Sequence, residues 1–78
     1  MMKSEHGMGN YRSETTLGTG YGSFETDANA IAWVEGHLQH ESPSVERVDL
    51  YRQQGGRGTI VMRWQRSGGG PWRQAAGR

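Results

Sequence analysis

The residues with the clearest metal-binding chemistry lie together in the segment Glu35–Glu41 (EGHLQHE). His37 and Glu41 are four residues apart, a spacing that places two side chains on one face of a helix. Imidazole and carboxylate groups are both zinc ligands. The sequence offers no third or fourth ligand at the spacing of known zinc motifs, and the chain has no cysteine. We therefore interpret the segment as the solvated end of a helix, with no metal and no cofactor.

A glycine-rich stretch at Gly18–Ser23 (GTGYGS) invites comparison with nucleotide-binding loops. The dinucleotide fingerprint Gly-x-Gly-x-x-Gly needs a third glycine where this chain has Ser23, and it needs the loop to open directly into a helix. Residues 24–26 intervene before the first helical signal, and there is no P-loop lysine. We therefore predict a glycine-rich hairpin turn at residues 18–20 and no phosphate-binding loop.

Catalytic constellations of other classes are also missing from the sequence. No serine stands in the Gly-x-Ser-x-Gly context of a nucleophile elbow. Paired carboxylates need a pocket to work as acid and base, and a chain of 78 residues is barely large enough for a core. We therefore expect the protein not to be an enzyme.

Arginine is the residue type with the strongest functional signal. Residues 1–49 carry three basic and eight acidic side chains, whereas residues 50–78 carry six arginines and no carboxylate. Arginine pairs with phosphate or carboxylate through two hydrogen bonds and stacks on flat rings. A sheet face that displays Arg47, Tyr51 and Arg63 would offer the basic and aromatic groups that bind single-stranded nucleic acid. Four arginines lie on or beside one predicted hairpin: Arg52, Arg57, Arg63 and Arg66.

Three features of the chain weigh against a nucleic-acid interpretation. The isoelectric point is about 8.2, whereas dedicated nucleic-acid domains have values above ~9. Asp49 shares the strand face of the arginines. Trp64 is in phase with Ile60 and Met62, which predicts a core position and not a stacking surface. A solvated arginine face without any ligand is the ordinary alternative.

Trp33 is the second residue with binding potential. At ~100° per residue it lies well off the apolar stripe of the predicted helix, which consists of Ile31, Val34 and Leu38. We expect Trp33 either to cap the edge of the sheet or to lie exposed beside His37. In the second case it would form an acidic and aromatic helix face suited to a protein partner.

These residues must be positioned by a short series of elements. Thr26 or Asp27 can cap a helix over residues 28–40, which must end before Pro43. A period of two predicts strands over residues 45–53 and 58–66.

Between these two strands, residues 54–57 hold a Gly-Gly turn. Ile60, Met62 and Trp64 are predicted to share one face of the second strand. Weaker strand patterns cover residues 11–17 and 21–25, where Phe24 is the best candidate for the core.

This order predicts an α+β fold of the form β-β-α-β-β, a small two-layer sandwich with one helix packed on an antiparallel sheet. We expect a flexible N-terminal arm over residues 1–10, a single domain over residues 11–66, and a flexible Gly/Arg-rich C-terminal tail over residues 67–78. No apolar run approaches the ~20 residues of a membrane span, and the N-terminus is not a secretory signal. We therefore expect a cytoplasmic protein with no membrane partner.

The preferred hypothesis is a small interaction module, of the adaptor or inhibitor type, that binds a protein partner. It would use the charged sheet face or the Trp33 helix face. One alternative is RNA or single-stranded DNA binding through the arginine-rich hairpin and tail. Another is a homodimer in which the acidic helix of one copy faces the basic hairpin of the other. The predicted partner-binding residues are Trp33, His37, Arg47, Tyr51, Arg52, Arg57, Arg63 and Arg66.

Overall fold

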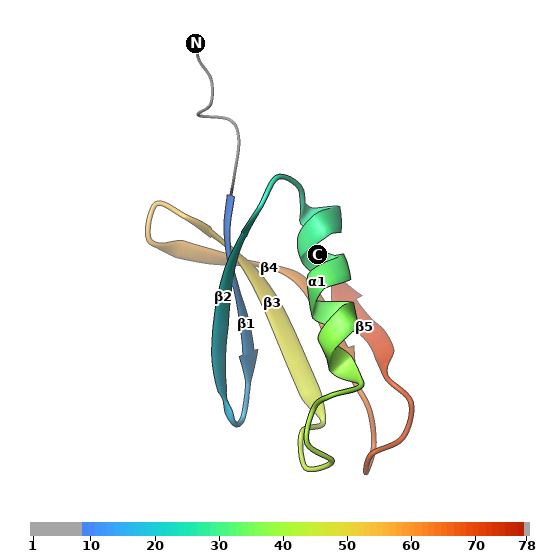
Figure 1. Ribbon diagram of the computed structural model, residues 1–78. Helices are drawn as coiled ribbons and strands as arrows, with labels where there is room; N and C mark the ends of the chain where they lie inside the picture. Colours follow the sequence, from blue (N-terminus) through green and yellow to red (C-terminus); the bar gives the residue numbers. More distant parts are fainter. Residues whose placement is uncertain (1–8, 78) are drawn as a thin grey trace.

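The computed structural model describes residues 9–77 and the side chains of residues 9–75. Its six elements are labelled in Figure 1. In chain order they are β1 (Gly9–Thr15), β2 (Gly18–Phe24), α1 (Asp27–Leu38), β3 (Arg47–Gln54), β4 (Arg57–Gln65) and β5 (Arg73–Gly77). The strands form one antiparallel sheet in the order β2-β1-β3-β4-β5, and α1 packs on one of its faces.

This architecture confirms the predicted α+β fold with one helix on an antiparallel sheet, and it adds a fifth strand. The predicted N-terminal arm lies outside the described residues up to residue 8, whereas Gly9 and Asn10 belong to β1. Within residues 9–77, no helix has the length and apolar character that crossing a membrane requires.

Helix α1 begins where the sequence predicts. The Thr26 side-chain oxygen accepts a hydrogen bond from the Asn29 backbone N–H at 3.0 Å, which satisfies one of the donors left free at a helix N-terminus. The helix ends at Leu38, two residues before its predicted end. It buries Ala30, Val34 and Leu38 against the sheet, which confirms the predicted apolar stripe for Val34 and Leu38, whereas Ile31 is half-buried.

The core forms between α1 and the middle of the sheet. Val48 and Leu50 of β3 are 2% and 0% exposed, and Trp64 of β4 is 1% exposed, as their alternating pattern predicts. Tyr11 is the most buried aromatic residue of the N-terminal half, whereas Phe24 is only half-buried. The buried hydrophobic residues are Tyr11, Ala30, Val34, Leu38, Val45, Val48, Leu50 and Trp64.

The turn between β1 and β2 lies at Thr16 and Leu17, so the predicted turn at residues 18–20 is wrong. Residues 18–24 are a strand, and its glycines make room for the aromatic side chains above it. A Cβ atom on Gly22 would lie 2.7 Å from Phe24 Cε2 and 3.6 Å from the Trp33 ring. Close packing therefore requires glycine here, and no phosphate-binding loop is formed.

The β3–β4 hairpin has the predicted Gly-Gly turn. Gly55 and Gly56 have φ values of 55° and 85°, and a type I′ turn needs positive φ at both positions. The register shifts between Leu50 and Tyr51.

This shift is a β-bulge, and it overturns one predicted face. Leu50 pairs with Met62 but Tyr51 pairs with Ile60, which puts Ile60 in phase with the opposite face from Met62 and Trp64. Val61 packs against the core instead.

Strand β5 was not predicted, because residues 67–78 have the composition of a flexible tail. Residues 73–77 pair with β4, and Trp72 anchors the segment that leads into this strand. Its Nε1–H donates to the Leu38 carbonyl oxygen at 3.0 Å, which also accepts a hydrogen bond from the Glu41 backbone N–H at the end of α1. Arg78 lies outside the described residues.

Candidate functional site: the open face of the sheet

The sheet face opposite α1 carries a group of charged side chains from four strands. Directly paired residues in neighbouring strands point to the same side of a sheet. The register pairs Glu14 with Asp49, Asp49 with Arg63, and Arg12 with Tyr51. We call this group the arginine face and define it by Arg12, Glu14, Arg47, Asp49, Tyr51, Arg63 and Arg73.

Asp49 is the centre of one ion-pair network on this face. Its side chain is only 7% exposed. Arg63 Nε donates to Asp49 Oδ1 at 2.7 Å, and Arg47 Nε lies 3.6 Å from Asp49 Oδ2. The hydrogen bond to Asp49 raises the pKa of Arg63, with the attraction between the two charges as the second cause. The carboxylate therefore fixes Arg63 by hydrogen bonds and attracts Arg47, whose side chain stays largely exposed.

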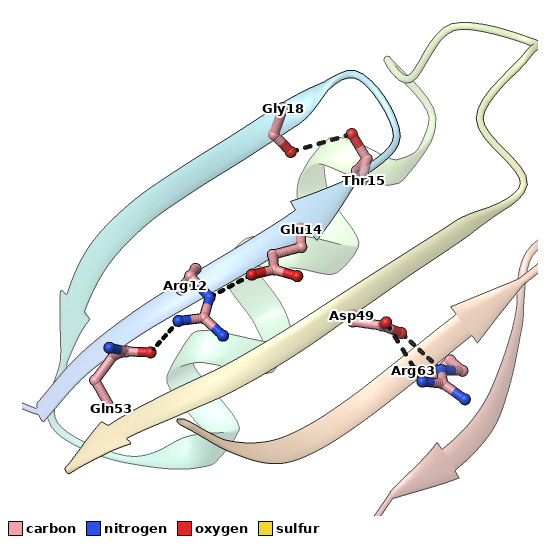
Figure 2. A network of polar contacts seen from close by, with 7 residues as sticks. All are labelled: Arg12, Glu14, Thr15, Gly18, Asp49, Gln53 and Arg63. Atoms are coloured by element: carbon pink, nitrogen blue, oxygen red, sulfur yellow. Dashed lines mark hydrogen bonds and ion pairs between the residues drawn. The ribbon is translucent and has the colours of Figure 1, made fainter. Parts of the chain in front are cut away.

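Arg12 organises a second network on the neighbouring strands. Its Nη1 donates to Gln53 Oε1 at 2.7 Å, and its Nε lies 2.6 Å from Glu14 Oε2 in an ion pair. The guanidinium carbon also lies 4.6 Å from the centre of the Tyr51 ring, a cation–π arrangement. Figure 2 shows both networks on the same side of the sheet, with the α1 ribbon behind it.

A shallow hollow of about 700 Å³ lies at one end of the arginine face. Arg47 and Arg73 both pair with Gln65, one from each neighbouring strand, so they flank it on the same face. All three residues line the hollow. The Arg47 side chain is 58% exposed and Arg73 is exposed as well. This arrangement presents two guanidinium groups to solvent beside a hydrogen-bonding amide.

Arg52 was predicted to bind a partner, but the structure places it in a contact with the helix. Its Nη1 donates to Asp27 Oδ2 at 2.5 Å, and the Tyr11 hydroxyl donates to Asp27 Oδ1 at 2.6 Å. The hydrogen bond from Tyr11, followed by that from Arg52, lowers the pKa of Asp27. Arg52 therefore fastens the start of α1 to β3 and is not part of the arginine face.

Arg66 also has an internal role. Its Nε donates to the Val45 carbonyl oxygen at 2.8 Å and its Nη2 to the Ser42 carbonyl oxygen at 2.7 Å. The guanidinium carbon lies 4.3 Å from the centre of the Trp72 ring. Arg66 thus joins the segment before β3 to the segment before β5.

The remaining predicted residues lie apart from the arginine face. Arg57 is exposed next to the β3–β4 turn. Trp33 is half-buried and packs over the face of β2, the edge strand, in agreement with one of its two predicted placements: its ring centre lies 5.1 Å from that of Phe24. His37 Nδ1 lies 2.7 Å from the Trp33 carbonyl oxygen and donates to it in the matching tautomer.

Two arginines of the face were missed by the sequence analysis. Arg12 alternates with the buried Tyr11 in β1, so the period of two could have assigned it to the open face. Arg73 could be found only by recognising β5. In the part of the chain that the structure describes, no group of three or more histidine or carboxylate side chains is placed to hold a metal ion.

No protein-family model, curated protein or solved structure matches this chain.

Proposed function

We propose that this protein is a non-enzymatic interaction module that binds an acidic segment of a protein partner on the arginine face. The main support for this proposal is the pair Arg47 and Arg73, which flank Gln65 at the hollow of about 700 Å³. Guanidinium groups bind carboxylates through paired hydrogen bonds, and the Gln65 side-chain amide adds a donor and an acceptor between them.

Fixed arginines favour binding because less side-chain freedom is lost when the partner arrives. Asp49 holds Arg63, and Glu14 and Gln53 hold Arg12, beside the more exposed Arg47 and Arg73. Arginine and aromatic residues are also the types that contribute most to protein interfaces. With four arginines and two carboxylates, the arginine face has a net charge of +2, which attracts an acidic segment.

The same contacts favour a protein over a nucleic acid. Glu14 and Asp49 lie among the arginines, and their charges oppose a continuous phosphate backbone. The Arg12 guanidinium covers one face of the Tyr51 ring, where a base would otherwise stack. RNA or single-stranded DNA is therefore the second candidate, to be separated from the first by experiment.

The proposal is tested by affinity capture from the cells in which the gene occurs, followed by affinity measurement with each purified partner. We expect R47A/R73A to lose a partner that wild type retains, with affinity reduced at least ~10-fold because two charge-assisted hydrogen-bond donors are removed. Both arginines are exposed, and the Arg63–Asp49 pair stays in place. R57A is the matched control, since it removes an exposed arginine outside the face, and it should bind like wild type.

Nuclease treatment and titration with mixed-sequence, single-stranded oligonucleotides complete the test. A capture that is abolished by nuclease, together with oligonucleotide binding that weakens steeply as salt rises, would replace the proposal with the nucleic-acid function. Identical partners for wild type and R47A/R73A would show that the arginine face is not the binding surface.

A further inference from the structure

Strand β2 is an edge of the sheet that lacks the usual protection against pairing. It lies at the end of the strand order, and no strand among the described residues pairs with its outer side. Natural edge strands are commonly blocked by charges, proline or bulges. The seven residues of β2 (GTGYGSF) contain no charged residue and no proline, and the register with β1 has no shift.

The hairpin geometry determines which backbone groups of β2 point outward. Thr15 and Gly18 pair across a connection of two residues, so they form a hydrogen-bonded pair. Such pairs alternate along an antiparallel ladder, which directs the N–H and C=O groups of Gly18, Gly20 and Gly22 toward β1. The corresponding groups of Thr19, Tyr21 and Ser23 therefore point away from the sheet.

The sequence of β2 is nearly symmetric about Tyr21. Gly20 and Gly22 stand on either side of it, and Thr19 and Ser23 stand beyond them. In an antiparallel pairing of two β2 strands around a two-fold axis at Tyr21, Thr19 lies opposite Ser23 of the other copy. Each outward-pointing pair then exchanges two backbone hydrogen bonds.

We propose that β2 is a homodimerisation edge that pairs antiparallel with β2 of a second copy, with Tyr21 on the two-fold axis. The occupant is a second copy because the strand is complementary to itself: Thr19 opposes Ser23, Gly20 opposes Gly22, and no like charges meet. Tyr21 is 73% exposed in the single chain, and pairing gives it the second Tyr21 as a cross-strand aromatic neighbour.

The opposite edge of the sheet does not have these properties. Strand β5 has five residues, begins with Arg73, and pairs with β4 through a register shift between Arg63 and Trp64. This pairing covers residues 62–65 of β4, so residues 57–61 form the rest of this edge; they begin with Arg57 and contain the bulge at Val61. Charge and irregularity are the features that discourage edge pairing. The contrast between the two edges assigns the dimer to β2.

Pairing through β2 would join the two sheets into one. A two-fold axis perpendicular to the sheet puts both α1 helices on one side and both arginine faces on the other. The inference does not depend on the proposed function, because β2 association can be measured without any other partner.

The first test is sedimentation velocity of the full chain over a ~100-fold range of concentration. We expect a concentration-dependent dimer for wild type. The variant T19K/S23K puts lysines opposite each other in both outer pairs, so its dimer should form only at about 10-fold higher concentration. The control Q39K/T59K adds the same charge at exposed positions outside β2 and should dimerise like wild type.

The second test restores the pairing with opposite charges. T19E/S23E alone should resemble T19K/S23K, whereas a mixture of the two variants should form heterodimers at the wild-type concentration, detected by native mass spectrometry. A wild type that stays monomeric overturns the proposal, even if another protein then binds the β2 edge. Equal dimerisation of T19K/S23K and Q39K/T59K also overturns the proposal. A wild-type dimer that dissociates in high salt overturns it as well, because salt sensitivity indicates pairing between the acidic helix and the basic hairpin.

Discussion

Asp27 connects the first helical turn to two strands. Its carboxylate accepts hydrogen bonds from Tyr11 in β1 and Arg52 in β3, and it lies at the helix N-terminus, where negative charge is stabilising. Both contacts act on the ionised form and lower the pKa of Asp27 from its ordinary value of 3.8. The stability that Asp27 contributes is therefore fully present above that ordinary value, and it is lost as the pH falls through the lower folded value.

We expect D27N to reduce the free energy of unfolding at pH 7 by about 1 kcal/mol, since the side chain is partly exposed and charged hydrogen bonds there are weakened by solvent. The variant should also lose stability less steeply than wild type on acidification below ~pH 4. Urea unfolding at a series of pH values measures both effects. E25Q removes an exposed carboxylate two residues away and should leave the acid dependence unchanged. Parallel curves for D27N and wild type would contradict this role of Asp27.

The arginines illustrate what a sequence can predict for single residues. The period of two assigned Arg47, Tyr51 and Arg63 to one strand face, because that signal is contained within each strand. It could not show that Arg52 binds Asp27, 25 residues away, or that Arg66 binds the Val45 carbonyl oxygen, 21 residues away. The tertiary fold decides which groups a long, flexible side chain can reach. Two of the four arginines on or beside the predicted hairpin, Arg52 and Arg66, therefore have structural roles.

Among the elements, those with local signals were predicted and those that depend on distant pairing were not. The Thr26 cap and the Gly55-Gly56 turn are specified within a few residues. Strand β5 exists because β4 offers it a pairing edge and because Trp72 docks on the end of α1. The bulge at Val61 likewise follows from the β3–β4 register, which a single strand does not encode.

Replacing Gly22 or Gly36 with alanine should change the free energy of unfolding in opposite directions, because Gly22 lies in a packed strand and Gly36 on an exposed helix surface. In β2, a Cβ on Gly22 would lie 2.7 Å from Phe24 Cε2, so the ring must shift and G22A should lower the free energy of unfolding by about 1–3 kcal/mol. In α1, Gly36 is exposed and has no neighbour within 4 Å of an added Cβ. G36A should raise stability by about 0.5–1 kcal/mol, because alanine loses less backbone entropy in a helix.

Thermal and urea unfolding of the two variants measure this difference. A G22A protein as stable as wild type would show that the aromatic cluster above β2 is loosely packed. A G36A protein without a gain would contradict the open surroundings of that residue.

At the scale of the whole molecule, folding neutralises part of the charge asymmetry of the chain. Residues 1–49 have a net charge of −5 and residues 50–78 of +6, yet Arg52 pairs with Asp27 and Arg63 with Asp49. These contacts join the acidic and basic parts of the sequence within one domain. Fewer charges then remain for a dimer of acidic helix against basic hairpin, whereas the exposed Arg47 and Arg73 keep the open face available to an acidic partner.

If β2 pairing joins two sheets, the dimer carries two arginine faces on one side and can bind a dense acidic surface through both. Two linked sites dissociate more slowly than one, by ~10-fold or more, without any new contact. On densely immobilised poly-L-glutamate, a stand-in for an acidic protein segment, Q39K/T59K should therefore dissociate at least ~10-fold more slowly than T19K/S23K. The two variants have equal net charge, but the lysines of T19K/S23K lie on the side of the arginine face, where Thr19 pairs with Glu14. Their extra attraction to poly-L-glutamate would slow the dissociation of T19K/S23K, so it cannot produce the expected difference.

The difference should disappear at sparse immobilisation, where only one face of a dimer finds a ligand. R47A/R73A in the wild-type background should bind weakly at both densities while still forming the dimer. Equal dissociation of Q39K/T59K and T19K/S23K from the dense surface would separate the two proposals: the β2 dimer could still form, but its two arginine faces would not act together.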